Sequence, residues 1–501
     1  MKDESFHALL RSRFPADTSA PLLETDQGSV WSWSQLDAAS ARMANALEQA
    51  GARPGDRIGA QVDKSPEALA LYLACLRAGL VYLPLNNAYT PAEVGYFVGD
   101  ARPAVFVCTP GALAALEPAA LEAGALSVLT LDADGGGSLA EAAARHPEAH
   151  APVLREAGHV AAIIYTSGTT GRSKGAMLTH GNLASNGLAL VEAWAFGPGD
   201  VLLHALPVFH VHGLFVAHHC VLLSGARMLY HRRFDLPLLL RDLPRATVLM
   251  GVPTFYTRLL ADPGFGRHTA PGVRLFVSGS APLLPETFNA FEARTGHRIL
   301  ERYGMSEAGM ITSNPLHGER RGGTVGQPLA GVTVRVADGE DRPLPAGETG
   351  GVQLRGPNVF AGYWGMPEKT REEFTADGFF RTGDVGRFDA HGYLSIVGRA
   401  KDLIITGGYN VYPREIELEI DAIPGVLESA VIGLPHPDFG EAVTAVVVAR
   451  PGAALDPAAM VASLRERLAA YKLPKRVILA DELPRNAMGK VQKAELRRLL
   501  G

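Results

Sequence analysis

An apolar run followed at once by a loop of glycines and hydroxyl residues constrains this 501-residue chain more than any other feature. Residues 160–164 (VAAII) are short and β-rich enough to form a buried strand. The loop 165–175 then reads YTSGTTGRSKG. Glycine lets a backbone approach a polyphosphate closely, and a lysine such as Lys174 offsets the anionic charge. The stretch therefore predicts a nucleotide phosphate loop at the end of a strand.

This loop is not a Walker A motif, because G-x-x-x-x-G-K-[S/T] cannot be laid on Gly168, Gly171 or Gly175. A P-loop NTPase, which would release ADP, is disfavoured for that reason. A plain surface turn would explain any three of these residues. It does not explain the whole run.

Strand and helix patterns alternate along the first three hundred residues, which predicts an α/β fold with layered, largely parallel sheets. Residues 57–62 and 104–108 have strand patterns, while Ser65-Pro66-Glu67 opens a helix that stops near Gly79. From about residue 323 the pattern changes to short strands with Gly- and Pro-rich turns, which predicts a small β-subdomain. About a hundred residues of mixed α and β pattern follow residue 402, enough for a small second domain.

Composition narrows the function classes. A net charge of −5 gives no indication of nucleic-acid binding, which usually requires a basic surface. The three cysteines are distant and odd in number, which predicts buried thiols and neither disulfides nor a spaced metal site. No apolar run approaches the roughly 20 residues needed to span a bilayer, and the N-terminus lacks a secretory signal. We therefore predict a cytoplasmic protein without membrane or nucleic-acid partners.

Four further motifs accompany the loop in order. They are residues 301–307 (ERYGMSE), 381–384 (RTGD) with 398–402 (GRAKD), 404–413 (IITGGYNVYP) and 483–491 (LPRNAMGKV). With the loop, the set resembles the adenylate-forming superfamily, which contains acyl-CoA synthetases, peptide-synthetase adenylation domains and luciferases. The resemblance covers residues 25 to 495. It implies that a carboxylate attacks MgATP to give an acyl-adenylate and pyrophosphate, and that a thiol then displaces AMP.

The resemblance also implies a role for each matching residue. Lys490 is the expected catalytic cation, since its ammonium can reach the α-phosphate and the attacking carboxylate. Glu307 is a Mg²⁺ ligand or orienter together with Thr166. Tyr303 stacks on adenine, and Asp384 with Arg399 binds the ribose. The residues assigned to ATP are Thr166, Ser167, Gly168, Thr169, Thr170, Gly171, Lys174, Gly279, Ser280, Glu301, Arg302, Tyr303, Gly304, Met305, Ser306, Asp384, Arg399 and Lys490.

The domain plan follows from the same resemblance. An N-terminal adenylation domain is expected over residues 1–398, a hinge over 399–402 with Lys401 and Asp402, and a mobile α+β lid over 403–501 that carries Lys490. Gly407, Gly408 and Tyr409 would face the thiol, because two glycines leave room for a pantetheine arm. No appended carrier domain follows Lys490, which favours free coenzyme A as the acceptor.

The acid is predicted from three strings, 204–214, 250–260 and 278–283, that are similar to those of malonyl-CoA synthetases. A dicarboxylate needs a cation for its unreactive end, and Arg258 is the candidate clamp, with a helix-surface arginine as the alternative. His210 is a candidate for orienting the acid, although one of His204, His210 and His212 can equally be a core histidine. Val211, where malonyl-CoA synthetases carry Thr, opens methylmalonate as a further substrate. Ser280 and Met305 complete the predicted acid pocket.

Two other hypotheses stay open. A medium-chain or aryl acyl-CoA ligase would share every motif except the clamp. A non-catalytic adenylate-binding protein is disfavoured by the intact Lys490, Glu307 and Asp384.

Overall fold

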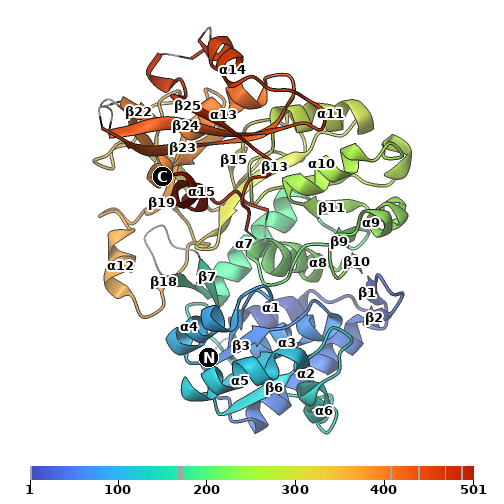
Figure 1. Ribbon diagram of the computed structural model, residues 1–501. Helices are drawn as coiled ribbons and strands as arrows, with labels where there is room; N and C mark the ends of the chain where they lie inside the picture. The colour runs from blue at the N-terminus through green and yellow to red at the C-terminus, as the bar shows by residue number, and fades with distance from the viewer. Residues whose placement is uncertain are drawn as a thin grey trace.

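The computed structural model describes residues 3–166, 173–406, 409–437, 440–465, 467–468, 470–486 and 489–501. The chain forms two large sheets, a small β-subdomain and a C-terminal domain (Figure 1). This arrangement confirms the predicted α/β fold with a β-subdomain and a smaller C-terminal domain.

A seven-stranded sheet in the order β18-β8-β7-β4-β3-β5-β6 carries the start of the phosphate loop. Its central strands are parallel, and β8 runs antiparallel to β7 with Thr166 opposite Lys174. Its strands are β3 (Arg57–Gln61), β4 (Val81–Pro84), β5 (Val105–Cys108), β6 (Ser127–Thr130), β7 (Val160–Thr166), β8 (Lys174–Thr179) and β18 (Gly362–Tyr363). The expected buried strand is thus β7, and its last residue is Thr166.

A nine-stranded sheet in the order β15-β14-β13-β12-β11-β9-β10-β1-β2 provides the second wall of the site. Strands β9 to β13 pair in parallel, so their carboxyl ends meet at one edge, where ligands of α/β sheets gather. The strands are β1 (Pro21–Thr25), β2 (Val30–Ser32), β9 (Val201–His204), β10 (Arg227–Tyr230), β11 (Val248–Gly251), β12 (Leu275–Ser278), β13 (Leu300–Met305), β14 (Gly309–Ser313) and β15 (Gln327–Pro328).

Local signals explain where the main helices begin. Helix α3 (Pro66–Arg77) starts after Ser65, whose hydroxyl accepts a hydrogen bond from the Ala68 amide. Helices α2 (Trp33–Gln49), α4 (Pro91–Ala101) and α7 (His180–Ala193) begin with capping boxes. The remaining helices of the N-terminal part are α1 (Phe6–Ser12), α5 (Leu113–Glu122), α6 (Ser138–Ala143), α8 (His218–Ser224), α9 (Leu236–Asp242), α10 (Pro253–Ala261), α11 (Pro285–Thr295) and α12 (Pro367–Glu372).

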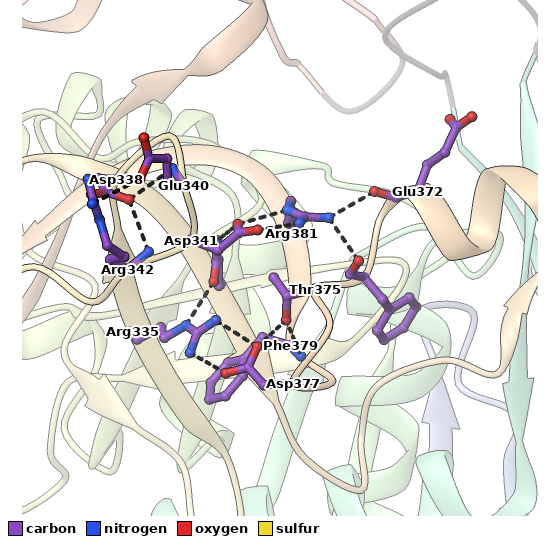
Figure 2. Close-up of polar contacts among 12 residues, drawn as sticks. Arg335, Asp338, Glu340, Asp341, Arg342, Glu372, Thr375, Asp377, Phe379 and Arg381 are labelled. Carbon is purple, nitrogen blue, oxygen red and sulfur yellow. Dashed lines mark hydrogen bonds and ion pairs between the residues drawn. The ribbon is translucent and has the colours of Figure 1, made fainter.

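The β-subdomain is a four-stranded antiparallel sheet of β16 (Thr333–Ala337), β17 (Gly350–Arg355), β19 (Phe380–Phe388) and β20 (Leu394–Arg399). Figure 2 shows the ion pairs that join β16 and β19 to neighbouring turns: Arg335 on β16 bonds to Asp377, and Arg381 on β19 bonds to Asp341. Nη1 of Arg381 also donates to the carbonyl oxygens of Glu372 and Phe374, at 3.0 and 2.8 Å. One arginine therefore joins β19 to the helix that precedes it.

The C-terminal domain has its own sheet, in which β23 (Val426–His436) pairs with β24 (Gly440–Ala449). It lies over the nine-stranded sheet beside α11, where Arg450 bonds to Glu286 at 2.8 Å (Figure 1). Its other elements are β21 (Ile404–Thr406), β22 (Tyr409–Val411), α13 (Pro413–Asp421), α14 (Pro457–Leu464), β25 (Arg476–Ala480) and α15 (Lys493–Leu500).

The hydrophobic core is divided in the same way. One continuous cluster of buried side chains joins the two large sheets, from Phe6 to Phe380. The C-terminal sheet has separate clusters, one around Ile416 and Val443 and one around Ile432 and Leu496. All three cysteines are buried free thiols, as predicted. Among the described residues, no helix has both the length and the apolar character needed to cross a membrane.

Candidate active site

One end of the site lies where the end of β7 meets the turn after β13 and the short strand β18. Oγ1 of Thr166 donates to Oε1 of Glu307 at 3.5 Å, and the Tyr363 hydroxyl donates to the same oxygen at 3.1 Å. Burial raises the pKa of Glu307, and the bond from Tyr363 opposes that rise. A carboxylate and a hydroxyl are the hard oxygen ligands that Mg²⁺ takes together with phosphate oxygens. The donor set therefore fits the predicted metal.

Lys174 is buried beside this pair. Its Nζ lies 3.4 Å from Oε1 of Glu373 and 4.2 Å from the centroid of the Tyr363 ring. The predicted ATP residues Ser167, Gly168, Thr169, Thr170 and Gly171 lie outside the described residues.

A second group lies where the β-subdomain meets β13. Nε of Arg399 is 2.7 Å from Oδ1 of Asp384, and the Tyr303 hydroxyl donates to Oδ2 of the same carboxylate. Strand pairing places Asp384 directly opposite Arg399. The three residues predicted to hold the nucleoside are thus brought together.

Lys490 reaches this group from the C-terminal domain. Its backbone N–H donates to Oδ1 of Asn486 at 2.9 Å, and Nη1 of Arg485 donates to the Gly489 carbonyl at 2.5 Å. Its side chain stays accessible to solvent, yet surrounding protein lowers its pKa, and the charge of Arg399 lowers it further. The predicted catalytic cation therefore lies close enough to the Asp384–Arg399 pair for their charges to act on it.

His210 lies within range of the charge of Lys490. Burial and the charge of Lys490 lower the pKa of His210 to about 4, so its imidazole is neutral at physiological pH. A narrow cavity of about 30 Å³ adjoins it, lined by Pro84, Asn86, Tyr89, Ile164, Tyr165, Phe209 and His210. Val211, the next residue, is buried.

The chain after His210 enters a π-helical turn, His212–Ala217. Such turns are frequent at functional sites. Nδ1 of His212 is 3.3 Å from Oγ of Ser280, which itself has a left-handed backbone with φ 71°. Strain of this kind in a non-glycine residue is held by its surroundings and clusters at ligand sites.

Arg302 lies on β13, near His212, and only 3% of its surface is exposed. It packs flat against the backbone of Gly279, where a Cβ would fall 2.4 Å from the guanidinium carbon. Among the described residues no hydrogen-bond partner exists for Nε and Nη2 of Arg302, Nε2 of His212 or Oγ of Ser278. Burial lowers the pKa of Arg302 to about 9, which leaves it charged at neutral pH.

Other predicted residues lie apart from this group. Arg258 is exposed on α10, with its guanidinium carbon 5.4 Å from the centre of the Phe234 ring. Glu301 is buried and accepts a bond from the Gly323 amide at 3.2 Å, and burial raises its pKa to about 8. Gly304, Met305 and Ser306 are half-buried at the end of β13.

The expected hinge lies between the last strand of the β-subdomain and the first strand of the C-terminal sheet. Oδ1 of Asp402 accepts a bond from Nη2 of Arg497 at 2.9 Å. Burial lowers the pKa of Lys401. Gly407 and Gly408 lie outside the described residues, and the backbone of Tyr409 pairs with Thr406.

Sequence reasoning missed Tyr363, Glu373 and Ser278 as site residues, and it treated His212 only as a possible core histidine. Tyr363 has no local signal, because it reaches Glu307 only through the pairing of β18 with β8. In the part of the chain that the structure describes, no cluster of three or more His, Cys, Asp or Glu could hold a metal by itself.

Comparison with known proteins agrees with this geometry. The model of the AMP-binding enzyme family matches residues 11–364, and that of the AMP-binding enzyme C-terminal domain matches 415–490. Sulfoacetate–CoA ligase of Cupriavidus necator is 38% identical, over 95% of this chain and 94% of its own. Feruloyl-CoA synthase of an Amycolatopsis species is also 38% identical, over 95% of both chains.

Malonate–CoA ligase of Arabidopsis thaliana is 36% identical, over 90% of this chain and 79% of its own. The ATP-bound crystal structure of MatB from Rhodopseudomonas palustris superposes with a TM-score of 0.97 at 54% identity, over 99% of both chains. The chain therefore belongs to the AMP-binding enzyme family, and within it to the AMP-forming acyl-CoA ligases, which act through an acyl-adenylate.

Proposed function

We propose that this enzyme ligates malonate to coenzyme A through malonyl-adenylate. The observation that carries the proposal is the buried Arg302, a cation whose Nε and Nη2 have no partner among the described residues. No acidic side chain of the described chain forms an ion pair with it, and an unpaired buried charge costs several kcal/mol. An anionic group on the substrate would offset that cost.

The surroundings of Arg302 support a carboxylate as that group. The open nitrogen of His212 and the free hydroxyl of Ser278 are buried in the same region, and Ser280 bonds to His212. A guanidinium can bind a carboxylate through two parallel hydrogen bonds. We assign Arg302 to the acid, and keep Arg258 as the second candidate for the clamp.

The reaction then has two balanced steps. A carboxylate oxygen of malonate attacks the α-phosphorus of ATP, and the bond to pyrophosphate breaks. The thiol of coenzyme A next attacks the acyl carbon, the bond to AMP breaks, and the thiol proton leaves to solvent or a base. Malonyl-CoA, AMP and pyrophosphate result.

The residues of the candidate site each have a defined part in this reaction scheme. Lys490 would offset charge on the α-phosphate and the attacking carboxylate, with the neutral His210 beside it. Asp384 and Arg399 would hold the ribose and Tyr303 the adenine. Thr166 and Glu307 would hold Mg²⁺, which supplies positive charge at the phosphates. Thiol entry past 407–409 and rotation about Lys401 and Asp402 belong to the same proposal.

The test measures AMP and thioester formation with MgATP and coenzyme A across malonate, methylmalonate, sulfoacetate, acetate and ferulate. We expect malonate to exceed acetate and ferulate by about a hundredfold in kcat/KM, since a site built for a polar group rejects acids that lack it. Dominance of ferulate would support an aryl ligase. Dominance of sulfoacetate would keep the anionic clamp and replace the substrate. Absence of AMP with every acid would support a non-catalytic binding protein.

A pair of variants tests the clamp. Arg302→Met is expected to lower kcat/KM for malonate by about a hundredfold, because the anionic tail loses its partner. Arg258→Met is the matched control on the exposed face of α10. Loss in Arg258→Met alone would return the clamp to Arg258.

A further inference from the structure

A buried lysine outside the proposed site closes the loop that carries His210 and His212. Lys64 lies between β3 and α3, and only 7% of its surface is exposed. Its Nζ donates to the carbonyl oxygens of His204 and Leu206, at 2.9 and 3.0 Å. It also lies 2.9 Å from Nδ1 of His204 and 4.3 Å from the centroid of the Tyr230 ring.

These contacts define the protonation of both partners. Three donors of an ammonium match three acceptors, two carbonyl oxygens and Nδ1 of a neutral His204. His204 then carries its proton on Nε2, which donates to the Gly213 carbonyl at 3.0 Å. Lys64 bonds to the start of the segment 204–213, and His204 bonds to Gly213 at its end. The two side chains together therefore hold both ends of this segment.

The loop is tightly closed at that point. A Cβ on Gly213 would fall 2.0 Å from the carbonyl oxygen of Pro207, so the end of the loop packs tightly against its own first half. Between them the chain carries His210, which adjoins the narrow cavity, and His212, which bonds to Ser280. A shift of either end would displace these side chains.

We propose that Lys64 is a positioning residue for the acid pocket, which sets the affinity for the carboxylic acid by fixing the loop 204–213 without touching substrate. The assignment of the pocket to an acid rests on the proposed function. The groups assigned to ATP lie on other segments, namely Thr166, Glu307, Asp384 and Arg399. The effect of Lys64 is therefore specific to one substrate.

The test compares Lys64→Met, Lys64→Arg and Arg77→Met in the full-length enzyme. Arg77 is a matched control, because it is a buried cation at the other end of α3, bonded to Ser40 and paired with Asp37. We expect Lys64→Met to raise the KM of the preferred acid about tenfold while the KM of ATP changes less than about twofold. Lys64→Arg restores part of the loss, because it keeps donors for the carbonyls. Arg77→Met lowers Tm and leaves both KM values unchanged.

Equal losses of Tm in Lys64→Met and Arg77→Met, with both KM values unchanged, would overturn the proposal, and so would a parallel rise of both KM values. If Lys64→Met does not fold, His204→Phe removes the side-chain bonds to Gly213 and Lys64, keeps the bonds from Lys64 to the backbone carbonyls, and is expected to raise the acid KM selectively. The KM is measured with whichever acid the wild type prefers. An acid other than malonate would therefore refute the proposed function and leave this inference standing.

Discussion

Nε of Arg399 lies 2.7 Å from Oδ1 of Asp384, while the Tyr303 hydroxyl donates to the other oxygen of that carboxylate. The pair joins two neighbouring strands of the β-subdomain, and Tyr303 comes from the nine-stranded sheet. One carboxylate thus bonds to side chains from both sheets at their junction.

Asp384→Asn is expected to raise the KM of ATP about tenfold or more, because the amide loses the charged bond to Arg399 and accepts fewer bonds from a ribose diol. Glu340→Gln, on an exposed turn of the same subdomain, is the control and leaves the KM unchanged. Steady-state kinetics with varied MgATP measures the KM of ATP in both variants. An unchanged KM in Asp384→Asn would remove this residue from the nucleotide site.

Glu307→Gln is expected to raise the Mg²⁺ concentration needed for half-maximal activity, since one of its carboxylate oxygens is lost as a ligand. Tyr363→Phe is the finer probe. The Tyr363 hydroxyl lowers the pKa of Glu307, so its removal raises that pKa further. The Mg²⁺ requirement of Tyr363→Phe is therefore expected to exceed that of the wild type more at pH 6 than at pH 8. A constant ratio across pH would contradict this account.

Glu301→Gln tests a buried carboxyl. Burial raises the pKa of Glu301 from 4.5 to about 8, so the folded protein keeps a proton that the unfolded chain releases between these values. The free energy of unfolding of the wild type therefore falls as pH rises over this range. Glutamine does not titrate. Urea unfolding at pH 5 and pH 8 should show the variant gaining stability relative to the wild type as pH rises, and parallel changes would refute the shift.

Asp341 has a left-handed backbone with φ 63° and bonds through its carboxylate to Arg381 and Gln353. Both Asp341→Ala and Asp341→Gly are expected to lower the free energy of unfolding, because Arg381 loses its partner. Alanine also pays the cost of the left-handed conformation, about 1 kcal/mol, which glycine avoids. Thermal unfolding should rank wild type above Gly and Gly above Ala. The reverse order would show that the backbone at this position relaxes.

Local patterns predicted much of the fold. The hydroxyl of Ser65 and the ring of Pro66 mark the start of α3, and the apolar run before Thr166 is the strand β7, because these signals act within a few residues. The motifs also brought together Thr166 with Glu307 and Asp384 with Arg399.

The parts that escaped prediction depend on contacts between distant segments. Tyr363 reaches Glu307 through strand pairing, and Lys64 reaches His204 across 140 residues. Arg302 packs against Gly279 and has no hydrogen-bond partner for Nε and Nη2 among the described residues, and both facts depend on contacts between distant segments. The π-helical turn at His212 follows no periodic signal. Sequence motifs identify which residues are candidates for the site, whereas the hydrogen-bond partners of each side chain depend on the folded core.

The separate cores of the two domains have a consequence for how this enzyme loses activity on heating. One apolar cluster spans both large sheets, whereas the sheet behind Lys490 packs on clusters of its own. The first cluster defines one cooperative unit and the C-terminal clusters together define a second, so calorimetry should resolve two transitions. Catalysis would then be lost at the transition with the lower temperature. If the C-terminal unit unfolds first, the N-terminal unit with the two large sheets would still be folded at that temperature. In the proposed function, nucleotide binds between the units, and it would then draw the two transitions together.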